Sequence, residues 1–248
     1  MLSTADAHVL WALIRGRSRA ATHAQRLQDF YADQADRYDA FRERLLQGRR
    51  ELIERLPVGP GARVTELGAG TGRNVEFFGE RLARLRSIVL VDLCPALIEQ
   101  ALRRRHRLAA SGVSNISVVH ADATTYRPCG PRDCVYFSYA LTMIPDWAGA
   151  IDNAIAMLRP GGVLGVVDFH LPDRVPVLDA FWRRWFAHDG VWLSDRHLPY
   201  LRRRLRPLFA REGRARLPLL PGLRAPYYLY IGQKAAAPEM GGEGETGD

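Results

Sequence analysis

The chain has 248 residues, of which 47% are hydrophobic, and its 35 Lys and Arg against 27 Asp and Glu give a formal charge of +8. This length and apolar content suit a single globular domain with a sizeable core, which excludes wholesale disorder. No apolar run approaches the ~20 residues of a membrane-spanning helix, and three cysteines without a CxxC pair form no disulfide framework. We therefore expect a reduced, cytoplasmic protein without a secretory leader.

The charge is distributed unevenly along the chain. Residues 235–248 contain four acids and no base, so residues 1–234 carry a formal charge of +12. The tail 235–248 is rich in Gly and Glu and is predicted to be disordered. A body this basic attracts something anionic: nucleic acid, an anionic membrane surface or an acidic metabolite. Composition alone does not choose among them.

Apolar spacing predicts helices first and an alternating α/β pattern after them. Residues 1–56 have helical periodicity and are expected to form an N-terminal cap or substrate lid, which a Gly-Pro-Gly turn at 59–61 ends. Beyond that turn, short apolar runs alternate with helical stretches, which predicts a doubly wound, mostly parallel sheet covered on both faces. The expected strands are 63–67, 87–92, 116–120, 133–139 and 162–169, and the expected helices are 73–84, 95–111 and 146–158.

The last part of the body completes this domain, which we place at 57–234. The segment 174–210 is rich in Trp and Arg and predicts a helical insertion. Two β-like runs, at about 214–220 and 226–233, flank a Pro-Gly turn and are expected to close the sheet.

The strongest motif lies where the first strand should run into the first helix. Residues 66–72 read Glu-Leu-Gly-Ala-Gly-Thr-Gly. Glycines at such a turn let a ligand approach the backbone, and the start of the following helix supplies N–H donors. Arg73 stands where the dinucleotide pattern GxGxxG has glycine. The carboxylate of Glu66 before the turn suits a ligand with an ammonium group better than a pyrophosphate.

Further acids follow the second and third expected strands. Asp92 ends the run 87–92, where a carboxylate accepts hydrogen bonds from both ribose hydroxyls. Asp122 follows the run 116–120, where it would accept from an adenine amino group while the backbone of Ala123 supports the ring edge. A helix N-cap is the alternative role for Asp122.

This ordered set resembles the S-adenosylmethionine (SAM)-dependent methyltransferases with a Rossmann-like fold. The matching elements, over about 61–170, are E-x-G-x-G-x-G, the ribose acid, the Asp-Ala step and Leu-Arg-Pro-Gly-Gly at 158–162. The resemblance implies SAM as the cofactor and an antiparallel hairpin at the end of the sheet, and no metal-ligand pattern is present. The residues that it implies for cofactor binding are Glu66, Gly68, Ala69, Gly70, Gly72, Asn74, Asp92, Leu93, Asp122, Ala123, Ser138 and Tyr139.

The roles implied within this set differ. Glu66 and the glycine loop would lie near the methionine part, and the Ser138-Tyr139 step beside the sulfonium. Gly72 has a second reading, in which it only allows close helix packing.

The segment 30–42 indicates the class of acceptor. Together with 139–147 and 182–186, it resembles the diacylglyceryl-homoserine N-methyltransferases of betaine-lipid synthesis. That resemblance implies successive methylations of a lipid head-group amine, and a partner enzyme that makes diacylglyceryl-homoserine. Tyr31 and Tyr38 are seven residues apart, on one helical face, where their rings would close over the sulfonium and the amine. Plain core packing is the alternative for these two rings.

The acceptor amine must be unprotonated to attack, and a base would help. His170 is the candidate catalytic base, with Asp168 and His197 as further candidates. Positioning alone also suffices if the amine loses its proton to water.

A lipid head group must be met at a bilayer surface. An amphipathic N-terminal helix and the arginine run 202–206 would hold the protein peripherally on the inner face of an anionic membrane. Ordinary packing or a solvated helix face is the alternative for both segments.

Two other functions remain open from the sequence. One is a methyltransferase of a quinone or another small hydrophobic metabolite, and the other is a non-catalytic SAM- or RNA-binding protein. A nucleic-acid substrate is not expected, because Ser-Tyr-Ala-Leu at 138–141 replaces the Pro-Pro-aromatic step of DNA amino-methyltransferases.

Overall fold

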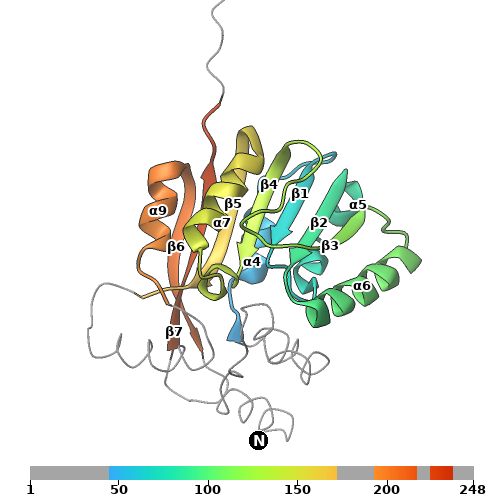
Figure 1. The fold of residues 1–248 in the computed structure, drawn as a ribbon, viewed down its shortest axis with the longest axis horizontal. Coiled ribbons are helices and arrows are strands. Elements are labelled where there is room, and N and C mark those ends of the chain that lie inside the picture. Colours follow the sequence, from blue (N-terminus) through green and yellow to red (C-terminus); the bar gives the residue numbers. More distant parts are fainter. Residues whose placement is uncertain (1–44, 172–192, 217–223, 237–248) are drawn as a thin grey trace, which may run out of the picture.

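The computed structural model describes residues 45–171, 193–216 and 224–236 and shows a central sheet with helices on both sides (Figure 1). The strands are β1 (Arg63–Leu67), β2 (Ser87–Asp92), β3 (Ile116–His120), β4 (Arg132–Ser138), β5 (Leu158–Phe169), β6 (Arg206–Arg216) and β7 (Arg224–Gln233). The α-helices are α4 (Arg49–Arg55), α5 (Arg81–Arg84), α6 (Pro95–Ala110), α7 (Trp147–Met157) and α9 (His197–Arg204), and the 3-10 helices are η1 (Arg73–Phe78) and η2 (Leu141–Met143).

The seven strands form one sheet in the order β3-β2-β1-β4-β5-β7-β6. The pairs among β1 to β5 are parallel, whereas β7 is antiparallel to both β5 and β6. The order reverses between β1 and β4, and a ligand binds at such a switch point, outside the carboxyl ends of the strands. The predicted doubly wound α/β fold with a closing antiparallel hairpin is therefore confirmed.

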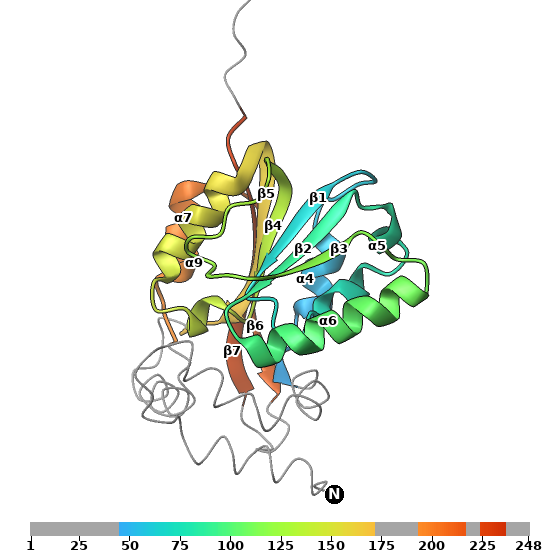
Figure 2. The same cartoon turned by 45° about the vertical axis from the view of Figure 1, so that its right-hand side comes forward.

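Helices cover both faces of this sheet (Figure 2). Apolar side chains of α4, η1 and α5 pack on one face in a core that contains Leu52, Val75 and Leu82. The other face is covered by α7 and α9, with Ile151 and Leu201 in the second core. Because both faces are buried, the central strands carry continuous apolar runs, as β2 does in Ser-Ile-Val-Leu-Val-Asp.

Three elements differ from their predicted bounds. The stretch 206–210 belongs to strand β6, although the expected insertion 174–210 was helical throughout. The expected helix 73–84 is divided, because Gly79 between η1 and α5 has a left-handed φ of 56°. Strand β5 begins at Leu158, before the Pro-Gly-Gly turn, because Leu158 still pairs with Arg132 of β4.

Several sequence expectations lie outside the described residues. These are the N-terminal cap up to residue 44 with Tyr31 and Tyr38, the part 174–192 of the expected insertion, and most of the acidic tail. Within the described ranges, no helix is long and apolar enough to cross a membrane.

Candidate functional site

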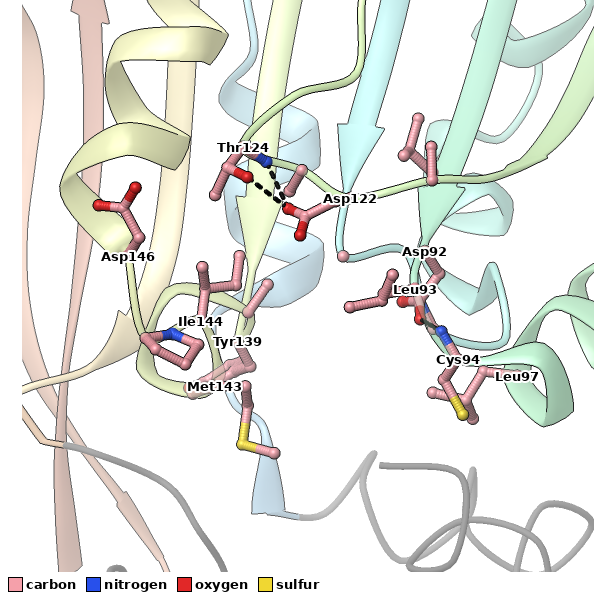
Figure 3. A pocket seen from close by; sticks show the side chains of 17 residues that line it. Asp92, Leu93, Cys94, Leu97, Asp122, Thr124, Tyr139, Met143, Ile144 and Asp146 are labelled. Carbon is pink, nitrogen blue, oxygen red and sulfur yellow. Dashed lines mark hydrogen bonds between the residues drawn. The ribbon is translucent and has the colours of Figure 1, made fainter. Parts of the chain in front are cut away.

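A pocket of about 300 Å³ opens at the carboxyl ends of the strands, beside the switch point (Figure 3). One wall comes from the end of β2 and the start of α6, and the opposite wall from the segment that joins β4 to α7. The loop after β3 contributes Asp122 and Thr124 between them. Its lining residues are Gly68, Gly70, Val91, Asp92, Leu93, Cys94, Leu97, Ala121, Asp122, Ala123, Thr124, Tyr139, Ala140, Met143, Ile144, Pro145 and Asp146.

The glycine loop closes one side of this pocket. Gly68 and Gly70 both line it and have φ values of 68° and 57°, a conformation that L side chains rarely adopt. A Cβ on Gly68 would also lie 2.5 Å from the Cβ of Ala140. Gly72 instead faces the packing between strand and helix, where a Cβ would lie 2.8 Å from Leu90. The first two glycines therefore shape the pocket, and Gly72 serves packing.

Asp92 is fixed at the pocket wall by two backbone donors. Its carboxylate accepts from the N–H of Gly70 at 2.7 Å and from the N–H of Cys94 at 2.8 Å. These bonds tie the end of β2 to the glycine loop and orient the carboxylate. Each carboxylate oxygen has two lone pairs, so an oxygen that accepts one N–H can also accept a ribose hydroxyl.

Asp122 and Ala123 line the pocket where the adenine was expected. The Oδ1 of Asp122 accepts from the N–H and the Oγ1 of Thr124, at 2.8 and 2.7 Å, which holds the side chain in a turn. The carbonyl of Ala123 accepts from the amide of Asn153 at 2.8 Å. The carboxylate of Asp122 stabilises this turn and also borders the pocket, and no helix of the structure begins at Asp122.

The charge of the pocket lining decides which ligands it suits. The described residues of the lining include three carboxylates, Asp92, Asp122 and Asp146, and no Arg, Lys or His. Asp146 also caps α7 by accepting from the N–H of Gly149 at 2.9 Å. Like charges repel, so such a wall disfavours a phosphate-bearing nucleotide and favours a nucleoside with a positive charge.

Glu66 does not line the pocket, although the motif suggested that its carboxylate faces an ammonium group. It is fully buried beneath the glycine loop, where it accepts from Asn74 at 2.6 Å and from the hydroxyl of Tyr136 at 2.8 Å. Arg49 donates to the same amide of Asn74 at 3.4 Å. Burial raises the pKa of Glu66 to about 7, although the two hydrogen bonds oppose the rise. In the structure Glu66 and Asn74 thus support the loop from behind.

Of the two residues Ser138 and Tyr139 at the end of β4, only Tyr139 lines the pocket. Tyr139 lines the pocket with its backbone at φ 54°, while its hydroxyl donates to the carbonyl of Gln47 at 2.6 Å. Its ring packs edge-on against Phe169, with 4.6 Å between centroids. Ser138 and Ala69 are buried but do not line the pocket, and the buried Oγ of Ser138 has no partner among the described residues.

The candidate bases lie outside the lining of the pocket. Asp168 accepts from the Oγ1 and N–H of Thr142 at 2.7 and 3.2 Å, and burial raises the pKa of Asp168 to about 6. His170 lies 3.3 Å from a carboxylate oxygen of Glu212. Burial lowers the pKa of His197 to about 4, and neither of its ring nitrogens has a partner in the described part of the chain. None of these three lines the pocket.

Some pocket residues escaped the sequence analysis as site residues. They include Thr124, Cys94 and Leu97, together with the Met-Ile-Pro-Asp segment 143–146. The segment 143–146 belongs to the stretch 139–147, which resembles the betaine-lipid N-methyltransferases. Its position just after the fourth strand, at the carboxyl edge of the sheet, could have indicated that it lines the pocket. No group of three metal-ligating side chains occurs in the described ranges.

Fold and pocket together define a class of protein: a Rossmann-like α/β domain with an acidic pocket at the carboxyl edge of its sheet. The family described as "methyltransferase domain" matches residues 36–213. Because this match covers most of the chain, the protein belongs to the methyltransferase-domain family, and S-adenosylmethionine is its cofactor. The lining described above fits that cofactor in charge and in the donors and acceptors it offers.

The curated proteins to which the chain is similar are named as methyltransferases. The chain is 29% identical over 157 residues to the trans-aconitate 2-methyltransferase of Methylobacterium radiotolerans, covering 63% of this chain and 56% of that protein. It is 28% identical over 171 residues to the ubiquinone/menaquinone biosynthesis C-methyltransferase UbiE of Pseudomonas fluorescens, covering 66% of each. The chain thus spans about half to two thirds of the length of the curated relatives that it matches.

Solved structures with the same fold include N-methyltransferases. NodS from Bradyrhizobium japonicum, in complex with S-adenosyl-L-homocysteine, superposes with a TM-score of 0.63 at 20% identity, covering 86% of this chain and 98% of that one. The phosphoethanolamine N-methyltransferase 2 of Haemonchus contortus gives a TM-score of 0.66 at 11% identity, covering 88% and 61%. At these identities the likeness establishes the fold.

Proposed function

We propose that this protein is a SAM-dependent N-methyltransferase that successively methylates the head-group amine of a lipid, turning diacylglyceryl-homoserine into a trimethylhomoserine betaine lipid. The observation that carries the methyl-transfer part is the pocket at the carboxyl edge, whose described lining has three carboxylates and no Arg, Lys or His. Bound SAM supplies a methyl group on a positively charged sulfur. The chain's own residues then bind, orient and shield the reactants.

The cofactor side of the pocket supports this role because it offers oriented hydrogen-bond acceptors and a glycine loop without side chains. Asp92 offers a carboxylate already oriented by Gly70 and Cys94, so little further ordering is needed when ribose hydroxyls bind. Gly68 and Gly70 leave room where side chains would intrude. Asp122 and Ala123 offer an acceptor and a backbone edge for a base.

The acceptor side is apolar and fixed by a buried hydrogen bond. Met143, Ile144 and Pro145 line the wall next to Tyr139. Asp168 accepts both the hydroxyl and the N–H of Thr142, which holds the segment that carries this wall. An apolar wall excludes water and suits an amine whose charge is already lost.

The proposal of a lipid amine as the acceptor rests on the resemblance of the segments 30–42 and 139–147 to the diacylglyceryl-homoserine N-methyltransferases. Two solved N-methyltransferases also share the fold. His170 is the proposed base, because it lies at the end of β5 with a carboxylate 3.3 Å from its ring. Tyr31 and Tyr38 are proposed to close over the reacting groups. The partner enzyme would supply diacylglyceryl-homoserine.

A second candidate is methylation of a quinone-type ring or another small hydrophobic metabolite. The similarity to UbiE over 171 residues favours it, and an apolar acceptor wall suits it equally. The two candidates differ in the atom that is methylated, which is nitrogen in one and ring carbon in the other.

The test is an acceptor panel read by mass spectrometry. Full-length enzyme and SAM are incubated with detergent-solubilised diacylglyceryl-homoserine, with a demethylated quinol and with trans-aconitate. The proposal predicts stepwise addition of methyl groups to the lipid nitrogen. Asp92→Ala should lose this activity, whereas Glu99→Ala, an acid with a 69% exposed side chain on α6, should retain it. Turnover of another acceptor with no methylation of the lipid would contradict the lipid assignment. Binding of SAM without turnover of any acceptor would favour the non-catalytic alternative.

A further inference from the structure

Three exposed arginines gather on one face of the β6–β7 hairpin. Arg216 of β6 lies directly opposite Arg224 of β7, and Arg214 lies opposite Pro226 two positions along. Side chains two apart on a strand share a face, and directly opposite residues share it too. Arg214, Arg216 and Arg224 therefore form one cluster, which we call the hairpin arginine cluster, and Ala215 and Ala225 are buried on the other side.

This arrangement is unfavourable for the isolated protein. Like charges directly opposite each other destabilise an antiparallel pair. No acid in the described ranges forms an ion pair with the hairpin arginine cluster, whereas the nearby Arg211 contacts Glu51. Glu212, on the same face as the cluster, contacts His170. A cluster of this kind is stabilised when an anion from outside binds to it.

The hairpin arginine cluster lies at the same edge of the sheet as the pocket. Both β5 and β6 are antiparallel to β7, so β6 runs parallel to β5 and ends at the carboxyl edge. Figures 1 and 2 both show this end of the hairpin extending beyond the neighbouring strands. The pocket is lined by residues at the same edge of the sheet. An extended anionic surface that contacts the cluster would therefore face the pocket mouth.

We propose that the hairpin arginine cluster is a docking surface for an anionic phospholipid bilayer. Guanidinium groups bind phosphate oxygens through paired hydrogen bonds, and a bilayer presents such phosphates in a plane. The proposal builds on the proposed function, since docking at this edge would bring lipid head groups to the acceptor wall. It also gives a role to the arginines that both strands carry at the exposed end of the hairpin.

The test measures binding to vesicles that contain no acceptor lipid. Full-length protein is sedimented with vesicles of phosphatidylcholine alone or with added phosphatidylglycerol. The variant Arg214→Gln/Arg216→Gln/Arg224→Gln should partition about 100-fold more weakly onto the anionic vesicles. The control Arg84→Gln/Arg86→Gln/Arg103→Gln removes the same charge from exposed positions, two of them at the opposite edge, before β2. It should partition within about twofold of the wild type on the same scale.

Further readouts separate failure of this proposal from failure of the proposed function. SAM affinity and turnover of a detergent-solubilised acceptor should be unchanged in the cluster variant. Its thermal unfolding temperature should be equal or higher, because a like-charge pair is relieved. Equal vesicle binding by the cluster variant and the wild type would overturn the proposal. So would binding of single-stranded RNA, but not of vesicles, through the same arginines. Vesicle binding that depends on the cluster would stand even if the lipid amine is not methylated.

Discussion

The buried carboxylate under the glycine loop makes a prediction about stability that depends on pH. Glu66 is fully buried, and Asn74 and Tyr136 each donate to one of its oxygens. Burial raises its pKa from 4.5 to about 7. Glu66→Gln keeps the size and the oxygen that accepts from Asn74, but it cannot ionise.

The size of the effect follows from the shift in pKa. A shift from 4.5 to about 7, at roughly 1.4 kcal/mol per unit, corresponds to about 3 kcal/mol. Because the folded protein binds the proton more tightly, this stabilisation is fully present below pH 4.5. It is lost as the pH rises through about 7. The glutamine variant should therefore gain up to about 3 kcal/mol relative to the wild type between pH 4.5 and pH 8.

The assay is urea unfolding of both proteins at pH 5 and pH 8. Asp168 also has a raised pKa, but it titrates in both proteins and cancels in their difference. Glu99→Gln, an exposed control, should show no change in its difference from the wild type between the two pH values. A Glu66→Gln difference that is the same at both pH values, or that favours the wild type at pH 8, would refute this reasoning.

The remaining predictions concern the walls of the pocket. Gly68→Ala places a Cβ 2.5 Å from that of Ala140, so SAM affinity measured by calorimetry should fall more than tenfold, by roughly 1.4 kcal/mol or more. Gly79→Ala, with a similar φ but nothing within 4 Å, should leave that affinity unchanged, and an equal loss in both variants would contradict the reasoning. Thr142→Val removes the 2.7 Å bond to Asp168 and should lower the free energy of unfolding by roughly 1–3 kcal/mol. Thr142→Ser keeps the hydroxyl and should retain most of that stability in urea unfolding, whereas a Thr142→Val variant as stable as the wild type would contradict the reasoning.

Much of the sheet was predictable because its strands are buried on both faces. The runs 63–67 and 87–92 appear in the structure with the predicted bounds, since continuous apolar segments between turns form buried parallel strands. Strand β6 was partly misassigned, because most of its residues are exposed and its order comes from pairing with β7. Such long-range pairing leaves no local periodicity.

The sequence predicted which strand ends carry the residues of the site, but not the directions in which their side chains point. The positions of Asp92 and Asp122 follow from strand ends, and both line the pocket. The sequence pattern did not reveal that Glu66 points under the loop. Side chains alternate between the two faces of β1, but the face that Glu66 occupies is known only once Tyr136 of β4 lies beside it and donates to its carboxylate. The apolar wall at 143–145 likewise depends on the bond between Thr142 and Asp168, which are distant in the sequence.

The most direct test of the central claim is a calorimetric titration of the wild type and Asp92→Ala with SAM. We expect saturable binding by the wild type and a loss of roughly 1.5–3 kcal/mol in the variant, because a hydrogen-bonded charged acceptor is removed. Glu99→Ala should bind like the wild type, and urea unfolding should show that all three proteins are folded. The acidic lining also predicts that a phosphate-bearing dinucleotide does not compete. Equal SAM affinity in Asp92→Ala and the wild type, or no binding by the wild type, would contradict the account.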